Sequence, residues 1–266
     1  MVSFVKKNSQ IVFIGAGNVA THLSLAMQEA GFSIAQIFSR CNDSAQTLAE
    51  ELNCSYTTNI NEMTTEASLY IFAVKDDALQ DMIAAMPSNK GIWTHTSGSL
   101  SIDIFRGYTD SYGVIYPLQT ISKHRETDLS KAPLFIEGNS AVVETAIYHV
   151  ADRLSDSVTI LSSEKRKYLH LAAVFACNFS NHMYTIASQI LEKQGIDRHV
   201  LQPLINETAK KLCTMHPVQA QTGPAVRGDL SIMELHQALL DDEQMRRLYA
   251  MISESIISQH INKERQ

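Results

Sequence analysis

The sequence lacks a surplus of positive charge and a long apolar run. Its 266 residues carry 22 Lys and Arg against 28 Asp and Glu, and the basic pairs Lys6-Lys7 and Lys210-Lys211 are too short to form a patch. Binding to nucleic acid or to an anionic membrane surface requires a basic patch, so we expect neither partner. The apolar run Met1–Val5 is interrupted at once by Lys6, and the sequence therefore predicts no signal peptide and no membrane span.

Paired cysteines are also absent. The chain has four cysteines, at Cys41, Cys54, Cys177 and Cys213. They are far apart and form no C-x-x-C motif, which argues against a disulfide framework or a zinc knuckle and for a reducing, cytoplasmic location. His216 and His236 have no acidic partner at metal-ligand spacing, so no metal is predicted.

In the first half of the chain, short β-rich runs alternate with helical stretches. The expected strands are Gln10–Ile14, Ser33–Ser39, Leu69–Val74, Gly91–His95, Tyr112–Tyr116, Leu134–Glu137 and Ser157–Leu161. The expected helices are Val19–Ala30, Ser44–Leu52 (with Asp43 or Ser44 as its N-cap), Asp77–Met86 and Ala141–Leu154. This alternation predicts the α/β class, with a doubly wound, parallel Rossmann sheet.

The strand signal ends near residue 162, and the rest of the chain reads as helix. Ser162 and Glu164 are typical of a helix start, and the helical pattern then continues to Gln194, where Gly195 supplies a C-cap. Further helices are expected at Arg198–Met215, Ser231–Leu240 (with a capping box from Ser231 to Glu234) and Asp242–His260. We therefore expect two domains: a dinucleotide-binding Rossmann domain at residues 1–162 and an all-α domain at 163–266.

A glycine-rich motif lies between the first strand and the first helix. Its residues read G-x-G-x-x-A: Gly15, Ala16, Gly17, Asn18, Val19 and Ala20. In this context Gly15 permits a tight turn, Gly17 lets backbone approach a pyrophosphate, and Ala20 allows helix and strand to pack closely. The free N–H groups of the helix start would face the phosphates. The motif predicts dinucleotide binding, with a glycine turn that binds no ligand as the alternative.

The end of the second strand indicates which dinucleotide is bound. NAD-binding enzymes usually place an acidic residue there for the ribose hydroxyls, but no acid occurs before Asp43. Ser39 and Arg40 occupy this position, and Arg40 could pair with a 2′-phosphate while Ser39 donates to it. We therefore predict NADP(H) as the cofactor. The alternative is that Arg40 is simply an exposed loop residue.

The chain resembles the superfamily of pyrroline-5-carboxylate reductase and 6-phosphogluconate dehydrogenase, most closely a branch with a Rossmann domain and a C-terminal domain of unknown function. The resembling residues are Gly15–Ala20, Ala73–Ala78, His95–Gly98, Tyr116–Thr120, Tyr168–His170, Asn178-Phe179, Pro203–Ile205 and Thr222–Asp229. The resemblance implies a Rossmann domain followed by a helical domain, and NADP(H) chemistry. Tyr116 departs from the branch, which usually has histidine before the Pro-Leu-Gln unit.

Two segments are expected at the carboxyl ends of strands, where doubly wound sheets bind their ligands. Ala73 and Val74 would lie beside the nicotinamide end of the cofactor. After the next strand, His95 would contact the cofactor, and Ser97 would form a hydrogen bond with an amide or a substrate carboxylate. Gly98 would let the backbone approach the ligand closely. The alternative for His95 is a hydrogen-bonded structural histidine at a strand end.

The long helix is the second candidate wall of the site. Leu171–Cys177 is apolar on every side, so we expect this stretch to be buried. Superfamily members use a polar residue on this helix, often a lysine, to contact substrate. Here Asn178, together with His170 or Asn181, would take that role, and His170 is the candidate proton donor because imidazole titrates near neutral pH. The alternative is a structural hydrogen-bond network that joins helices in a dimer.

The loop Thr222–Asp229 offers a possible anion clamp. Arg227 could bind a substrate carboxylate with both guanidinium nitrogens, and Asp229 could orient it. The alternative is structural: Asp229 would cap the following helix and Arg227 would form an ion pair with it. The Arg-Gly-Asp tripeptide is not read as a cell-adhesion signal, because the chain lacks disulfide pairs.

These features favour an NADP(H)-dependent oxidoreductase that transfers hydride to or from a small carbonyl, imine or hydroxy-acid substrate. Two alternatives stay open: a non-catalytic NADP-binding sensor or regulatory dimer, and an enzyme whose hydride partner is a deazaflavin. We also expect a homodimer built by the helical domain, since a helix of about 45 Å is longer than a globule of this size needs.

Overall fold

The computed structural model describes residues 9–122, 125 and 127–264. The chain forms two compact units, Met1–His182 and Met183–Gln266, which we call unit 1 and unit 2. The N-terminal segment Met1–Val5 and the pair Lys6-Lys7 lie outside the described residues. No helix within the described ranges is both long enough and apolar enough to span a membrane.

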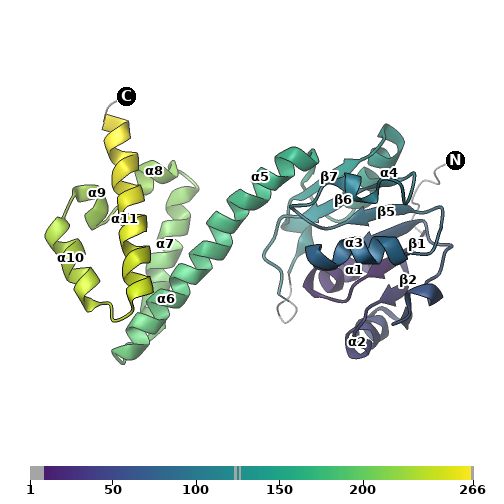
Figure 1. Ribbon diagram of the computed structural model, residues 1–266, viewed down its shortest axis with the longest axis horizontal. Helices are drawn as coiled ribbons and strands as arrows, with labels where there is room; N and C mark the ends of the chain where they lie inside the picture. Colours follow the sequence, from purple (N-terminus) through teal and green to yellow (C-terminus); the bar gives the residue numbers. More distant parts are fainter. Residues whose placement is uncertain (1–8, 123–124, 126, 265–266) are drawn as a thin grey trace. The chain divides into compact units, whose positions relative to one another are not determined.

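Unit 1 is built on an eight-stranded sheet. Figure 1 shows this sheet with the helices that flank it. The strands are β1 (Gln10–Ile14), β2 (Ser33–Phe38), β3 (Ser55–Thr57), β4 (Leu69–Phe72), β5 (Ile92–His95), β6 (Tyr112–Pro117), β7 (Leu134–Gly138) and β8 (Val158–Ile160). Their spatial order is β3-β2-β1-β4-β5-β6-β7-β8. The chain therefore reverses direction across the sheet between β1 and β4, where a doubly wound sheet binds its ligand.

Helices cover both faces of this sheet because its strands are apolar on both sides. Ile11 and Phe13 of β1 pack with α1 (Asn18–Glu29), α2 (Asn42–Leu52) and α4 (Ala141–Ala151). Val12 and Ile14 face the opposite side, which is covered by α3 (Asp76–Ala85) and the short helix η2 (Ile102–Phe105). Two further short helices, η1 (Ile60–Glu62) and η3 (Leu129–Lys131), lie in the connections. The predicted Rossmann architecture is confirmed.

Three details of unit 1 differ from the sequence prediction. The strand β3 was missed, because it is three residues long and two of them are exposed. The pair β6–β7 is antiparallel, which the apolar pattern of a strand cannot reveal because it carries no direction. The helix α2 begins earlier than expected, with Cys41 rather than Asp43 or Ser44 at the N-cap.

The long helix forms as predicted but contains an unexpected segment. It runs through α5 (Ser163–Ala173), a π-helical stretch η4 (Val174–Phe179) and α6 (Ser180–Lys193). Ser162 caps its start, with its side chain accepting from the Lys165 N–H, and Gly195 ends it with a φ of 69°. The division between the units falls inside this helix, between His182 and Met183.

The middle of the long helix was predicted to be buried, and in the single chain this is wrong. Leu171 is 52% exposed and Phe175 is 62% exposed. The sequence correctly indicates an apolar surface on every side, but none of the elements described covers it. The π-helical stretch also shifts the angular position of every later residue, so the spacing expected of a regular helix does not hold beyond Val174.

Unit 2 is all-helical, as predicted. After η5 (Arg198–Leu201) come α7 (Gln202–Leu212), α8 (Pro217–Ala220), α9 (Pro224–Arg227), α10 (Leu230–Leu239) and α11 (Glu243–Glu264). The short helices α8 and α9 were missed; each begins with proline, which fits the first turn of a helix. The predicted capping box is wrong, because the N-cap of α10 is Asp229 and Ser231 lies within the helix.

Candidate active site

The turn between β1 and α1 is built around two glycines with different surroundings. Gly15 has a φ of +119°, and a Cβ there would lie 2.3 Å from the carbonyl oxygen of Ala73. The turn therefore lies directly against the backbone that follows β4. A Cβ on Gly17 would meet nothing within 4 Å, so the space in front of this residue is open. Ala20 is fully buried where α1 crosses the sheet.

The amino end of α1 has the properties of a phosphate site. Gly17 is the N-cap and no side chain caps the helix, so no side-chain bond occupies its first N–H groups. The Asn18 amide donates to the carbonyl of Ile121 at 3.1 Å, and Nε2 of His22 lies 3.1 Å from the carbonyl of Ser122. These two contacts hold the segment after β6 against the first turns of α1.

The end of β2 presents one arginine to solvent. The Ser39 hydroxyl accepts from the N–H of Cys41 at 3.2 Å, which shapes the turn into α2. Arg40 is exposed, and within the described part of the chain it has no hydrogen bond or ion pair. Its guanidinium is therefore available to an anionic group placed beside the β2 end.

The hydroxyl of Ser97 is fully engaged by the protein. It donates to Oδ2 of Asp76 at 2.9 Å and accepts from the N–H groups of Ser99 and Leu100, both at 3.1 Å. A hydroxyl has one donor and two acceptor positions, so none is left for a substrate. The residue shapes the segment after β5 and ties it to the first turn of α3.

His95 is enclosed at the end of β5. Its Nδ1 accepts from the N–H of Ser97 at 3.1 Å, and its buried Nε2 has no hydrogen-bond partner among the described residues. Phe105 lies beside the ring, with centroids 5.7 Å apart. Burial, reinforced by the charge of Arg166, lowers the pKa of His95 to about 3, so the imidazole is neutral. The whole residue is buried, so it offers no surface to a cofactor.

Arg166, which the sequence prediction missed, organises this region. Its guanidinium is fully buried and donates to the carbonyls of Ser97 and Leu100. It also forms an ion pair with Glu137 of β7 at 2.9 Å, and Ser163 donates to the same carboxylate oxygen at 2.6 Å. Arg166 thus fastens the segment after β5 to α5. It lies in the run Lys165-Arg166-Lys167, which resembles a solvated charge cluster.

The side chains of Tyr116 and His170 meet beside the same segment. The Tyr116 oxygen lies 2.9 Å from Nδ1 of His170, and the two rings form an edge contact at 5.9 Å. Tyr116 lies in β6, which is buried along its whole length, and burial raises the pKa of its hydroxyl, although the charge of Arg166 opposes this. The fold therefore brings together a phenol and an imidazole that are 54 positions apart in the chain.

The remaining predicted residues are placed as follows. Asn178 is exposed and lies in the π-helical stretch, and Asn181 is exposed on α6. Arg227 forms an ion pair with Asp229 in unit 2, at 2.8 Å, and Asp229 occupies the N-cap of α10 without accepting a capping hydrogen bond. This is the structural arrangement that was kept as the alternative for these two residues, apart from the missing capping bond.

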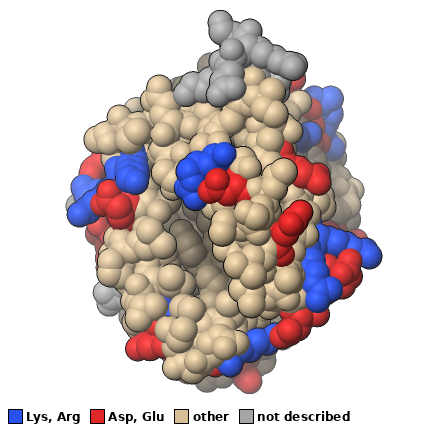
Figure 2. Space-filling model, turned by 90° about the vertical axis from the view of Figure 1, so that its left-hand side faces the viewer, with Lys and Arg blue, Asp and Glu red and all other residues tan. Residues whose placement is uncertain are grey.

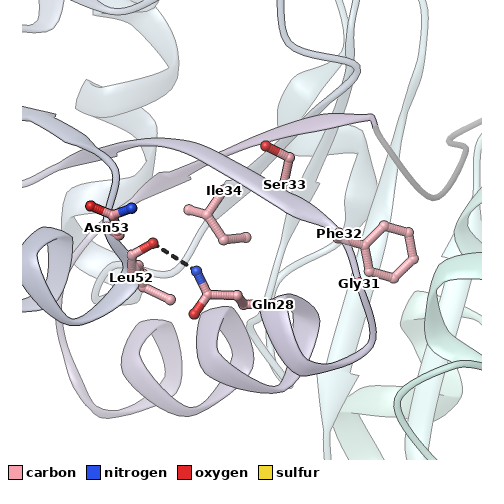
Figure 3. Close-up of a pocket in the computed structure, with 7 residues that line it drawn as sticks. All are labelled: Gln28, Gly31, Phe32, Ser33, Ile34, Leu52 and Asn53. Atoms are coloured by element: carbon pink, nitrogen blue, oxygen red, sulfur yellow. Dashed lines mark hydrogen bonds between the residues drawn. The ribbon is translucent and has the colours of Figure 1, made fainter.

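Two hollows lie away from these residues. One of about 500 Å³ lies where β2 begins, opposite the carboxyl ends of the strands, and Figure 3 shows the residues that line it. None of its lining residues is titratable: Gln28, Gly31, Phe32, Ser33, Ile34, Leu52 and Asn53. The second, of about 260 Å³, lies within unit 2 between α6, α9 and α11 and is lined mainly by apolar side chains. Neither contains groups suited to acid–base chemistry at a strand end.

No cluster suited to a metal ion occurs in the part of the chain that the structure describes: no three or more His, Cys, Asp or Glu side chains gather at one place. The four cysteines are free thiols.

Comparisons with known proteins agree with this architecture. Residues 10–97 match the family described as NADP oxidoreductase, coenzyme F420-dependent, and residues 132–256 match a domain of unknown function, DUF2520. A solved structure of a candidate NADP oxidoreductase from Bacteroides fragilis is 42% identical, with a TM-score of 0.89, and the match covers 95% of this chain and 99% of that one. This chain belongs to the same family of NADP oxidoreductases.

More distant structures share the fold. A pyrroline-5-carboxylate reductase from Streptococcus pyogenes has 14% identity and a TM-score of 0.66, covering 96% of this chain and 99% of that one. An imine reductase from Myxococcus stipitatus, solved with NADP+, has 15% identity and a TM-score of 0.63, covering 94% and 92%. A search of the curated proteins found no match. The resemblance inferred from the motifs and the NADP class of the cofactor are confirmed.

The residues of unit 1 fit this cofactor. The open space at Gly17 would accommodate a pyrophosphate that a Cβ would obstruct, and the uncapped start of α1 would supply N–H donors. Arg40 is exposed and unpaired among the described residues at the β2 end, where a 2′-phosphate is expected. Gly15, Gly17, Ala20 and Arg40 would hold the adenine-nucleotide half, and Ala73 and Val74 would flank the nicotinamide half.

Proposed function

We propose that this oxidoreductase reduces a small carbonyl or imine substrate, or oxidises the corresponding hydroxy acid, at the carboxyl ends of β4, β5 and β6. When bound, NADPH supplies a hydride from C4 of its nicotinamide, which is the cofactor's own chemistry. The observation that supports this proposal most is the paired Tyr116 and His170, an acid–base group beside the segment that follows β5. An oxidoreductase of this kind needs such a group to handle the substrate proton.

Some of the proposed site residues contact the substrate, and others hold the site in shape. We assign the proton donor to His170 and a substrate hydrogen bond to Asn178, with Asn181 beside it on the helix. Ser97 and Gly98 act through the shape of the segment after β5, because the Ser97 hydroxyl has no free position. To bind a substrate carboxylate, Arg227 would have to break its ion pair with Asp229 and form one with the substrate.

Cofactor selectivity tests the role of Arg40. We expect NADPH to bind more tightly than NADH by roughly 10- to 150-fold, since a charge-assisted hydrogen bond contributes about 1.5–3 kcal/mol. Arg40→Ala should remove most of this preference and leave NADH affinity nearly unchanged, measured by titration of each cofactor. Arg198→Ala, which removes an exposed arginine of unit 2, is the matched control and should change neither affinity. Equal affinities in the unmodified protein would contradict the assignment.

Turnover separates an enzyme from a sensor. NADPH oxidation is followed with pyruvate, 1-pyrroline-5-carboxylate and coenzyme F420 as probes of the carbonyl, imine and deazaflavin classes. We expect turnover with a carbonyl or imine, and Asn178→Ala should abolish it with little change in NADPH affinity, because this residue contacts substrate. NADPH binding without turnover of any probe would favour the non-catalytic sensor, and turnover with coenzyme F420 alone would favour the deazaflavin enzyme.

We further propose that the chain forms a homodimer through its helical surfaces. Large apolar side chains are exposed along α7, α10 and the long helix, among them Leu204, Leu235, Leu239, Leu171 and Phe175. Apolar surface of this extent marks an interaction site in a soluble protein. Light scattering should give about twice the chain mass of 29.6 kDa. A mass of one chain at micromolar concentration would contradict the proposal.

A further inference from the structure

The hydrogen bond between Tyr116 and His170 leaves the imidazole with two unequal nitrogens. Nδ1 is bonded to the Tyr116 oxygen at 2.9 Å, whereas Nε2 is bonded to no residue that the structure describes. Among the residues that the structure describes, the only fully buried side-chain nitrogen or oxygen without a hydrogen-bond partner is Nε2 of His95, not an atom of His170. The free nitrogen of His170 is therefore the one that can exchange a proton with another molecule.

Gly98 fixes where the imidazole lies. A Cβ at this position would stand 2.7 Å from both Cγ and Nδ1 of His170 and 2.8 Å from its Cβ. Such distances are far inside van der Waals contact, so the ring fits only because residue 98 has no side chain. Ser97 and Arg166 hold this segment in turn, through the hydroxyl of the first and the guanidinium of the second. The ring is thus held from two sides, by β6 and by the segment after β5.

The other ionisable groups around the pair are held by contacts of their own. Arg166, one turn earlier on the same helix, is neutralised by its ion pair with Glu137 of β7. His95, at the end of β5, is held neutral by burial. Burial also raises the pKa of Tyr116, so its proton stays on the oxygen. Asp76, at the start of α3, accepts from Ser97.

We propose that Tyr116 is a positioning residue that accepts the Nδ1–H of a protonated His170, so that the Nε2–H proton is the one delivered to substrate. The inference rests on the proposed function. As hydride arrives at the substrate carbon, the C=O or C=N π bond breaks and its electron pair takes the proton whose bond to Nε2 breaks. The imidazole becomes neutral, keeps its Nδ1–H on the Tyr116 oxygen, and regains its second proton from water.

Kinetics of the full-length protein with the substrate probe that it reduces test this role. His170→Gln should lower kcat about 100-fold or more, and Tyr116→Phe about 10-fold, with NADPH affinity unchanged in both. The kcat of the double variant should equal that of His170→Gln within about 2-fold, because Tyr116 acts only through His170. Tyr112→Phe removes a hydroxyl of equal burial from the same strand and should leave kcat unchanged.

The pH profile distinguishes positioning from a loss of packing. A proton donor loses activity as pH rises through its titration, so kcat of the unmodified protein should fall on the basic side. Without the Tyr116 oxygen as acceptor the imidazolium is less stable, and Tyr116→Phe should move this fall to lower pH. Gly98→Ala, which displaces the ring, should lower kcat as well. A Tyr116→Phe variant with unchanged kcat and an unshifted profile, or a fully active His170→Gln variant, would overturn the proposal.

A spectroscopic measurement tests the contact without turnover. In protein labelled with 15N-histidine and saturated with NADP+, the His170 Nδ1–H proton should give a resolved signal, identified by its loss in His170→Gln. The signal should disappear in Tyr116→Phe and persist in Tyr112→Phe; its persistence in Tyr116→Phe would overturn the inference. If the unmodified protein reduces none of the probes, the proposed function itself fails, and this proton-delivery role fails with it.

Discussion

The two units of the molecule differ in what a single chain can bury. Unit 1 encloses two apolar clusters, one on each face of its sheet, and also buries an arginine and a histidine. In unit 2, Ala225 and Met233 are the only buried side chains in the described residues, while leucines, isoleucines and methionines lie exposed along its helices. Figure 2 shows the side of the molecule that lies on the left in Figure 1. Uncharged residues fill the centre of this face, and charged residues lie mainly around its edges.

This difference separates a domain that encloses its own core from one whose helices leave many apolar side chains exposed. A sheet covered on both faces removes most of its apolar area from water within one chain, whereas a few helices without a common core do not. The chemistry follows the same division. Unit 1 holds one buried ion pair, Arg166–Glu137, whereas the described ion pairs of unit 2 are all at the surface.

The largest expected effect is at the buried ion pair of unit 1. Arg166→Met leaves the Glu137 carboxylate without its cation and frees the carbonyls of Ser97 and Leu100. Removing one partner of a buried pair costs about 3–5 kcal/mol, measured as the free energy of unfolding in denaturant. A loss below about 1 kcal/mol would show that solvent reaches this pair and that the contrast between the units is overstated.

The two glycines of the β1–α1 turn should separate folding from binding. Gly15→Ala places a methyl group against the Ala73 carbonyl at a positive φ, and should lower the free energy of unfolding by about 2–4 kcal/mol. Gly17→Ala meets no protein atom and should leave stability nearly unchanged while weakening NADPH binding. Thermal unfolding and cofactor titration of both variants measure this. Equal stability of the two variants would contradict the geometry of the turn.

The buried imidazole of unit 1 should make stability depend on pH. The pKa of His95 is about 3 in the folded chain, against about 6.5 for an unfolded histidine, so between these values the unfolded state binds more protons. Stability is therefore full above pH 6.5 and falls as pH decreases, by about 2–3 kcal/mol between pH 6.5 and 4.5. His95→Gln cannot bind this proton, so its free energy of unfolding should change less between pH 6.5 and 4.5. If the stability of both proteins fell in parallel with pH, His95 would not be the cause.

The smallest expected effect is at the surface ion pair of unit 2. Arg227 and Asp229 have side chains that are 61% and 37% exposed, and exposed pairs contribute about 0–1 kcal/mol. Arg227→Ala should accordingly change the free energy of unfolding by less than about 1 kcal/mol, in the same denaturant assay as Arg166→Met. A larger loss would mean that this pair is covered in the protein as it exists in solution, for example by a second chain.

Local patterns were enough for much of the fold, and they also predict the residues that would bind the cofactor. The Gly15–Ala20 motif, Ser39 and Arg40 could be assigned from sequence because a strand, a turn and a helix that follow each other in the chain also adjoin in space. The strand boundaries, the start of the long helix at Ser162 and its end at Gly195 follow from apolar periodicity and capping residues. These features depend on neighbours within a few residues, which a sequence displays directly.

Other features depend on contacts between distant positions. The buried state of Arg166 results from carbonyls and a carboxylate supplied by β7 and by the segment after β5, so its sequence neighbours, two lysines, indicate the opposite environment. Likewise, the Tyr116–His170 pair and the space for it at Gly98 arise only where β6, α5 and that segment meet. Sequence determined the cofactor class and the order of elements, because both depend on residues that lie close together in the chain. Tertiary structure decided which side chains have free hydrogen-bonding positions, because that depends on partners brought together by folding.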